Sequence, residues 1–435
     1  MDPLATLTMK HLRQGFWALS IVAALASGAD GARAETPASA PLTDETSLVR
    51  FALAHNPELR AAHWEQDIAS AGVTRASALS NPALRGEWLH VQSPADYGWG
   101  VGLEWTPPQP GVYGAGKDAA RAQVRATKAD FSERAADLEA AVRRSYAQVG
   151  ALGEEIALAE QSVATRRSVY QAVKERVAHG AASRIDLSLS SVSLARGEQE
   201  RDLLLLARSS EVASLEALLG LPADRALDLS ARGTSEAPSA ASPAPSATDL
   251  EQRALAERPQ LQADAARSDA AEATLSAERA KRWPWLALQA RYRRHDQSTY
   301  ENDVTLGLEL TLPIFNQNPG PIAAAEAARR EQRDLLFAHR FNIEREVRAL
   351  RAESERRREI AEHYATTIAP VLSEHAALVK QALAGLELDL TALLAAEDLV
   401  TKSGIEYLEA RLAQRKAEIA LARTLGEYGR TTESK

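Results

Sequence analysis

The sequence predicts a mainly α-helical membrane protein built from two tandem repeats, with long helical hairpins and four β-strands in each chain. Three observations lead to this prediction. Landmark residues recur 202 to 206 positions apart, two proline-poor helical stretches are unusually long, and short segments alternate apolar residues with small or polar ones. Self-similarity at a fixed period is the signature of a repeat architecture. We therefore expect one doubled unit rather than several globular domains.

Composition and charge exclude several classes of protein. The 435 residues carry a net charge of −8 and contain no cysteine, and aromatic residues make up 5%. Few aromatics argue against several well-filled globular cores. Without cysteine there is no disulfide, thiolate metal site or lipid-modified N-terminal cysteine. The acidic balance disfavours nucleic acid as a partner.

The N-terminus reads as an export signal over residues 1–34. Lys10 and Arg13 precede a short apolar stretch at 16–26, and Ala32-Arg33-Ala34 offers a small-x-small cleavage site. The apolar stretch is shorter than the roughly 20 residues of a spanning helix, although a retained N-terminal anchor is the alternative. Cleavage would remove three positive and two negative charges, which leaves −9 on the mature chain.

The first repeat is expected at 35–220 and the second at 250–430, joined by a Pro/Ala/Ser-rich linker at 221–249. The paired landmarks are Asn56-Pro57 with Arg258-Pro259, Asn81-Pro82 with Trp283-Pro284, Gly180 with Gly385, and Leu218-Leu219-Gly220 with Thr424-Leu425-Gly426.

Each repeat should contain a helix, two strands and a long helical hairpin. In the first repeat a helix at 44–79 breaks at Asn56-Pro57, and a second helix at 115–179 stops at Gly180, where Ser183 caps the return helix. Those 65 residues would form a rod of about 98 Å.

The matching rod of the second repeat is expected at 322–384, with a turn at Gly385 and a return helix to Tyr428. The hairpin tips then fall at 179–186 and 384–391. Helices of this length must pair as coiled coils to bury their apolar stripes.

Strands are expected near 83–92, 98–106, 285–295 and 302–312. Their alternation makes one face apolar and the other small or polar. That pattern fits a half-buried soluble sheet or, with lipid outside and water inside, an outer-membrane barrel. Aromatic residues near strand ends favour the barrel because they resemble interface girdles: Trp88, Trp99, Trp105, Trp285 and Tyr292. Four strands cannot close a barrel, so the chain must oligomerise.

Five motifs carry a resemblance to a known family. They are "HNPELRAA" (55–62), "NPAL" (81–84), "LTLPIFNQNPGPIAAAEA" (310–327), and the tip sequences "AHGAASRIDLSLS" (178–190) and "LAGLELDLTALLAAEDL" (383–399). Together they resemble the outer membrane factor (TolC-like) family of tripartite efflux systems, in particular its CzcC-type heavy-metal branch. The turn at 109–120 departs from the glycine-rich pattern of that branch.

The resemblance implies a homotrimer with a 12-stranded outer-membrane β-barrel in lipid and a periplasmic α-barrel. Such a duct is passive and works with a periplasmic adaptor (membrane fusion) protein and an inner-membrane RND transporter. The family's gate implies tip candidates at Gly180, Ser183, Asp186, Gly385, Glu387 and Asp389. Glu387 stands where one well-known member has a locking arginine, so an Asp–Arg lock at that point is not expected.

No enzymatic chemistry is expected, and neither is a cofactor or a tight metal site. The stretch 111–118 nearly matches a phosphate-binding loop, but Asp118 replaces the required hydroxyl residue. The nine histidines show no metal-binding spacing. The sequence thus predicts an efflux duct for heavy-metal cations. A duct for drugs or organic solutes, a periplasmic coiled-coil adaptor or structural protein, and an exported enzyme are the alternatives.

Overall fold

The computed structural model describes residues 44–92, 95–222, 227, 246–295, 302–385 and 390–429. The expected signal peptide and most of the expected linker lie outside these residues, as do the tip residues Glu387 and Asp389.

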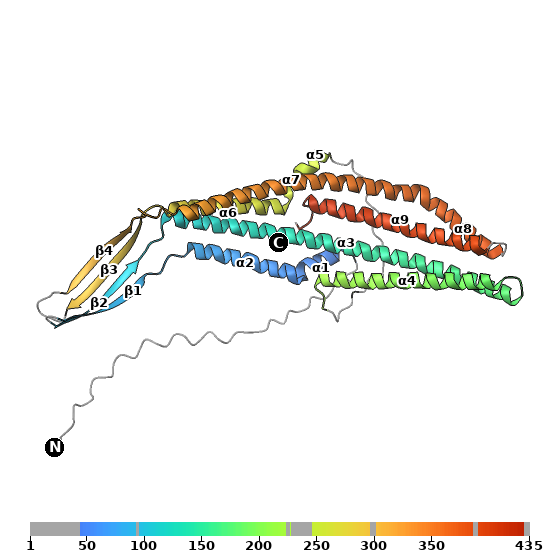
Figure 1. The fold of residues 1–435 in the computed structure, drawn as a ribbon, viewed down its shortest axis with the longest axis horizontal. Helices are drawn as coiled ribbons and strands as arrows, with labels where there is room; N and C mark the ends of the chain where they lie inside the picture. Colours follow the sequence, from blue (N-terminus) through green and yellow to red (C-terminus); the bar gives the residue numbers. More distant parts are fainter. Residues whose placement is uncertain are drawn as a thin grey trace, which may run out of the picture. The chain divides into compact units, whose positions relative to one another are not determined.

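The described chain runs twice through one order of elements (Figure 1). The first repeat consists of α1 (Glu45–His55), α2 (Pro57–Ser77), β1 (Ala83–Gln92), β2 (Ala95–Trp105), α3 (Pro110–Ala178) and α4 (Arg184–Leu219). The second consists of α5 (Ala247–Glu257), α6 (Pro259–Ala280), β3 (Trp285–His295), β4 (Asp303–Thr311), α7 (Pro319–His363), the π-helical turn η1 (Tyr364–Ile368), α8 (Ala369–Gly385) and α9 (Leu390–Thr424). The predicted fold class, mainly helical with four strands and an internal repeat, is confirmed.

The two repeats end in the same way: a glycine after the last helix contacts the break between the first two helices of the same repeat. Asn56 separates α1 from α2: its Oδ1 accepts the Leu59 amide at 3.0 Å, and its Nδ2 donates to the Leu218 carbonyl at 2.9 Å. Gly220 (φ +68°) lies against this break. In the second repeat Gly426 (φ +71°) lies against the Glu257 carbonyl in the same manner. The landmark spacing in the sequence therefore reflects a contact made twice.

We expect Gly220→Ala to destabilise the protein. The left-handed backbone disfavours any side chain by about 1–3 kcal/mol, and a Cβ would approach the His55 carbonyl oxygen at 2.8 Å and Pro57 Cδ at 2.9 Å. Gly153→Ala is the matched control because Gly153 lies within α3 with open space around it. That change should stabilise by roughly 0.5–1 kcal/mol. Thermal unfolding measures both, and equal midpoints for the two variants would contradict the expectation.

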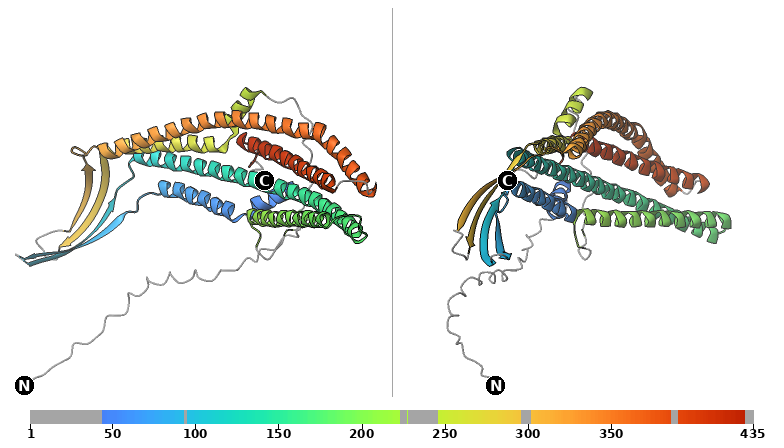
Figure 2. Two further views of the ribbon diagram at one scale, coloured as in Figure 1. Left: turned by 45° about the vertical axis from the view of Figure 1, so that its right-hand side comes forward. Right: turned by 60° about the vertical axis from the view of Figure 1, so that its left-hand side comes forward.

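The longest helix, α3, is the centre of the helical part. It begins five residues earlier than expected, at Pro110, because proline is tolerated at the first helical position. Its buried stripe is mostly small, with Ala122, Ala126, Ala135 and Ala136 all nearly inaccessible. Small residues let α6 and α4 approach α3 closely, as Figure 2 shows for the bundle. The hydrophobic core is therefore spread along long, narrow helix–helix interfaces.

The second long helix is not continuous, which corrects the expectation of one rod over 322–384. A π-helical turn, Tyr364–Ile368, separates α7 from α8. Pro370 follows this turn and has no amide hydrogen to give to the ladder, while the Ala369 amide bonds back five residues to the Tyr364 carbonyl. The helix bends there in Figure 1, whereas α3 in the first repeat has no proline after its first residue, Pro110, and runs unbroken.

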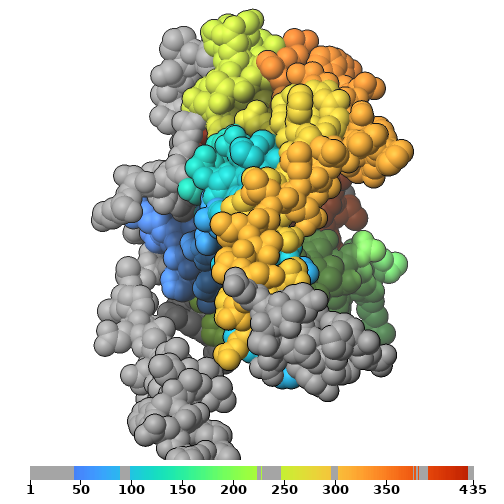
Figure 3. All heavy atoms as spheres, turned by 90° about the vertical axis from the view of Figure 1, so that its left-hand side faces the viewer, coloured from blue at the N-terminus to red at the C-terminus, as the bar shows by residue number. Residues whose placement is uncertain are grey.

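The four strands form one antiparallel sheet in the order β1-β2-β3-β4, so the two repeats meet at the β2–β3 pair. Gln109 fastens this junction to the helices: its Nε2 donates to the carbonyls of Ala280 at 2.7 Å and Trp283 at 3.0 Å. Figure 3 views the end of the molecule that carries the sheet, with β3 and β4 toward the viewer. Within the described part of the chain, the helices are all too short or too polar to cross a membrane.

Candidate functional site

One face of the sheet is apolar over most of its length. Strand register places the following residues on it: Leu84, Trp88, Trp99, Val101, Leu103, Trp105, Leu286, Leu288, Ala290, Tyr292, Val304, Leu306, Leu308 and Leu310. Leu306 is 80% exposed, and most of its large neighbours on this face are exposed as well. Isolated exposed apolar residues are ordinary, but a patch of this extent marks contact with lipid or protein.

The opposite face is polar and carries several ion pairs. Arg85 lies 2.7 Å from Glu104, and Arg293 lies 3.4 Å from Asp303. The side chains of Glu87 and Arg293 meet over Gly100, where a Cβ would lie 2.8 Å from Glu87 Oε1. The glycines of β2 therefore make room for charged side chains from both neighbouring strands. A sheet with one apolar and one ionic face is suited to separate an apolar medium from an aqueous one.

The aromatic candidates divide between the two faces. Trp88, Trp99 and Tyr292 lie on the apolar face toward the sheet end remote from the helices, where the Trp99 and Tyr292 rings meet edge to face at 5.8 Å. Trp105 ends β2, and its Nε1 donates to the Ser80 carbonyl at 2.9 Å. Trp285 pairs with Thr311, so it shares the polar face. The membrane-interface role of all these aromatic residues stays a prediction.

The first hairpin tip is built by local hydrogen bonds. Gly180 has φ +74° and follows the end of α3. Ser183 and Asp186 form a reciprocal capping box at the start of α4: Ser183 Oγ accepts the Asp186 amide at 3.1 Å, and Asp186 Oδ2 accepts the Ser183 amide at 3.0 Å. Asp186 thus has a structural task whether or not it also gates. In the second hairpin Gly385 is the last residue of α8.

A buried ion pair joins the two hairpins below their tips. Arg166 of α3 is 4% exposed, and its Nε donates to Glu397 of α9 at 2.8 Å. Its other nitrogens reach Asp398 at 3.1 Å and the Ser193 carbonyl of α4 at 3.1 Å. Ser162 and Thr401 donate hydroxyl bonds to Glu397 Oε1. Three helices are therefore held by one guanidinium; we call Arg166, Glu397 and Asp398 the hairpin clamp.

Glu397 and Asp398 lie within the tip sequence at 383–399, but Arg166 is not among the residues that the sequence predicts for a site. The sequence does contain a signal for Arg166. Arg166 falls on the same helical stripe as Val163, Val169 and Val173, all buried in α3. An arginine in an apolar stripe requires a buried acceptor, and those acids supply it.

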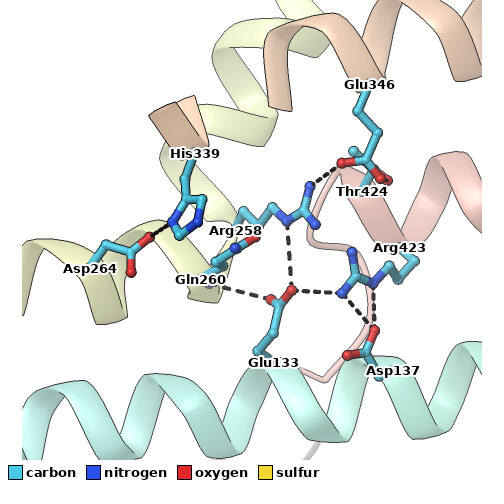
Figure 4. A network of polar contacts seen from close by, with 9 residues as sticks. All are labelled: Glu133, Asp137, Arg258, Gln260, Asp264, His339, Glu346, Arg423 and Thr424. Atoms are coloured by element: carbon cyan, nitrogen blue, oxygen red, sulfur yellow. Dashed lines mark hydrogen bonds and ion pairs between the residues drawn. The ribbon is translucent and has the colours of Figure 1, made fainter. Parts of the chain in front are cut away.

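A second polar network lies where α3, α6, α7 and the end of α9 meet (Figure 4). Glu133 stands between two arginines, 2.7 Å from Arg423 and 3.7 Å from the buried Arg258. Arg258 also donates to Glu346 at 2.8 Å. Burial raises the pKa of Glu346, but the Arg258 hydrogen bond and charge outweigh it and lower that pKa below its usual value. This network fastens the last helix to both repeats.

The described residues contain no cluster of three or more His, Cys, Asp or Glu side chains placed to hold a metal ion. The near-match to a phosphate loop at 111–118 lies within helix α3 rather than in a loop. A helix cannot wrap its amides around a phosphate, so nucleotide binding at that stretch has no structural support.

A two-faced antiparallel sheet at one end of long helical hairpins is the fold of an outer-membrane channel subunit. The chain matches the family described as Outer membrane efflux protein over residues 48–221 and 250–427, and it belongs to that family. This is a family of efflux channels rather than of enzymes.

Three relatives illustrate the match. Cobalt-zinc-cadmium resistance protein CzcC of Cupriavidus metallidurans is 25% identical over 322 residues, covering 71% of this chain and 72% of CzcC. A membrane protein from Pseudomonas aeruginosa has 21% identity and a TM-score of 0.72, covering 90% of this chain and 98% of its own. The open-state MtrE outer membrane channel of Neisseria gonorrhoeae has 19% identity and a TM-score of 0.71, covering 88% of each chain.

Proposed function

We propose that this chain forms a homotrimeric exit duct in the outer membrane and exports heavy-metal cations. It would work passively with a periplasmic adaptor protein and an inner-membrane RND transporter. The observation that carries the duct is the two-faced sheet: its exposed apolar face suits lipid, and its ion-paired face suits a water-filled lumen.

The sheet also supports the trimer. β1 and β4 are its two edges, and each pairs with one neighbour only. Unpaired strand edges are not tolerated in the hydrocarbon of a bilayer, and bacterial barrels begin at about eight strands. Three chains, with β4 of one paired to β1 of the next, would close twelve strands and leave no edge. The helices would then continue the barrel into the periplasm.

Two observations support a metal-cation cargo. The curated relative CzcC is named for resistance to cobalt, zinc and cadmium. Acidic residues also gather near the tips, with Asp186 on the first hairpin and Asp398, the exposed acid of the hairpin clamp, on the second. Threefold repetition would turn each acid into a ring, and carboxylate rings favour cations. In this proposal the tips form the periplasmic gate.

The cargo is tested in a deletion strain of the source bacterium, once without and once with a complementing plasmid. Loss of the chain should lower the minimum inhibitory concentration of cobalt, zinc or cadmium severalfold, because export stops at the outer membrane. Complementation by the wild-type chain should restore growth. A strain that keeps its metal tolerance but loses drug tolerance would replace the metal assignment with organic solutes. Unchanged tolerance to both would argue against an export role.

A further inference from the structure

An arginine interrupts the apolar face of the sheet at its far end. We call the far end the side remote from the helices, where β1 and β3 finish and where β2 and β4 begin. On β3 the apolar face reads Leu286, Leu288, Ala290, Tyr292 and then Arg294, which pairs in register with Trp99. Arg294 therefore shares the lipid-facing surface of the proposed barrel rather than its ionic lumen.

Among the residues that the structure describes, Arg294 differs from the arginines of the opposite face in having no acid beside it. Arg293, its chain neighbour, lies 3.4 Å from Asp303, and Arg291 lies 3.7 Å from Glu87. Arg294 forms no ion pair with any residue that the structure describes, and its side chain is exposed. A guanidinium on a lipid-facing surface, with no acid among the described residues to pair with it, needs an anion from its surroundings.

The height of Arg294 on the sheet matches the level of lipid headgroups. It stands eight residues beyond Leu286, about 26 Å along a strand. At a barrel tilt of 35–45° this is roughly 20 Å of height, close to the apolar band of about 25 Å. Trp99 lies beside Arg294 in register, Tyr292 lies two residues below it on β3, and Val304 is the last apolar residue of β4 at this end. Aromatic girdles mark that boundary in membrane barrels.

We infer that Arg294 binds a phosphate group of lipid A in the outer leaflet, with Trp99 beside it and Tyr292 below it packing against the lipid. This inference rests on the proposed membrane insertion, which places the far end of the sheet away from the periplasm. A planar guanidinium offers paired donors that match phosphate oxygens. Lipid A is the outer-leaflet lipid that presents phosphates at this level. A trimer would hold three such contacts around its rim.

Arg294→Gln tests the inference, and Arg293→Gln is the matched control because its side chain lies one residue away on the opposite face. Each mature full-length protein is reconstituted in phosphatidylcholine vesicles without additive, with lipid A, or with phosphatidylglycerol. Lipid A should raise the thermal midpoint of the wild type and of Arg293→Gln. Arg294→Gln should lose most of this increment, and its apparent affinity for lipid A in detergent titrations should fall about tenfold.

Equal increments for the wild type and Arg294→Gln would overturn the inference, and so would an equal increment from phosphatidylglycerol. Ion conductance of the wild-type vesicles separates this failure from failure of the proposed function. If the wild-type vesicles conduct but lipid A has no effect on the thermal midpoint, only the proposed Arg294 contact is refuted. If the wild type never inserts, the proposed duct itself is wrong.

Discussion

Replacing Leu308 by arginine is expected to prevent the chain from assembling in the outer membrane. Leu308 lies at the middle of the apolar row of β4, paired with Leu288, and is exposed in the single chain. An arginine facing lipid at the midplane of a barrel costs about 2–4 kcal/mol, and a trimer would contain it three times. Heat-modifiable trimer in the outer-membrane fraction is the measurement, and we expect it to be nearly absent.

Gly307→Arg is the matched control for this experiment. Gly307 is the preceding residue and points to the ionic face, where its Cβ would make an ordinary 3.6 Å contact with Gln289 Cβ. An arginine there would reach water and Glu309, so assembly should continue near the wild-type level. Normal assembly of Leu308→Arg would show that the apolar face contacts something other than lipid.

The second large effect is expected from Arg166→Met. This change leaves the carboxylate of Glu397 buried without its positive partner, which typically costs about 3–5 kcal/mol. Because the clamp fastens α9 to α3 and α4, its loss should also let the second hairpin move away from the first. We expect a lower thermal midpoint together with a larger basal conductance in planar bilayers.

Arg167→Met provides the control at the adjacent position. Arg167 pairs with Glu198 at 2.7 Å on the surface, with both side chains exposed, so its loss should change stability by about 0–1 kcal/mol. The double change Arg166→Met with Glu397→Gln should recover much of the loss because it removes the buried unpaired charge. If Arg166→Met unfolds at the wild-type temperature, the clamp has no stabilising role.

The tip shows how a residue picked from a resemblance acquires a different explanation. Asp186 is a gate candidate by family likeness, and in the structure its carboxylate accepts the Ser183 amide in a capping box. A capping bond of this kind contributes about 0.5–2 kcal/mol. Both roles act on the same hairpin, so an Asp186 variant alone would not separate gating from capping. Arg166 is the better probe because it is remote from the cap.

Much of the fold is visible in the sequence because its signals are local. Alternation over 83–92 and 285–295 gave strands that the structure places at Ala83–Gln92 and Trp285–His295. The second rod was expected to be continuous although Pro370 lies within it. Proline signals a local defect, but whether a helix ends, kinks or inserts a π-helical turn depends on the packing around it.

The sequence alone determined the repeat, the long helices and the two-faced strands, because each depends on periodicity or on residues that change the backbone locally. Only the tertiary structure decided which residues of the two repeats contact one another. It brought Arg166 to Glu397, 231 residues away, and placed Arg294 on the apolar face of the sheet while Arg293 faces Asp303. Such contacts depend on register and on distant partners. A one-residue shift in a strand would exchange the roles of those two arginines.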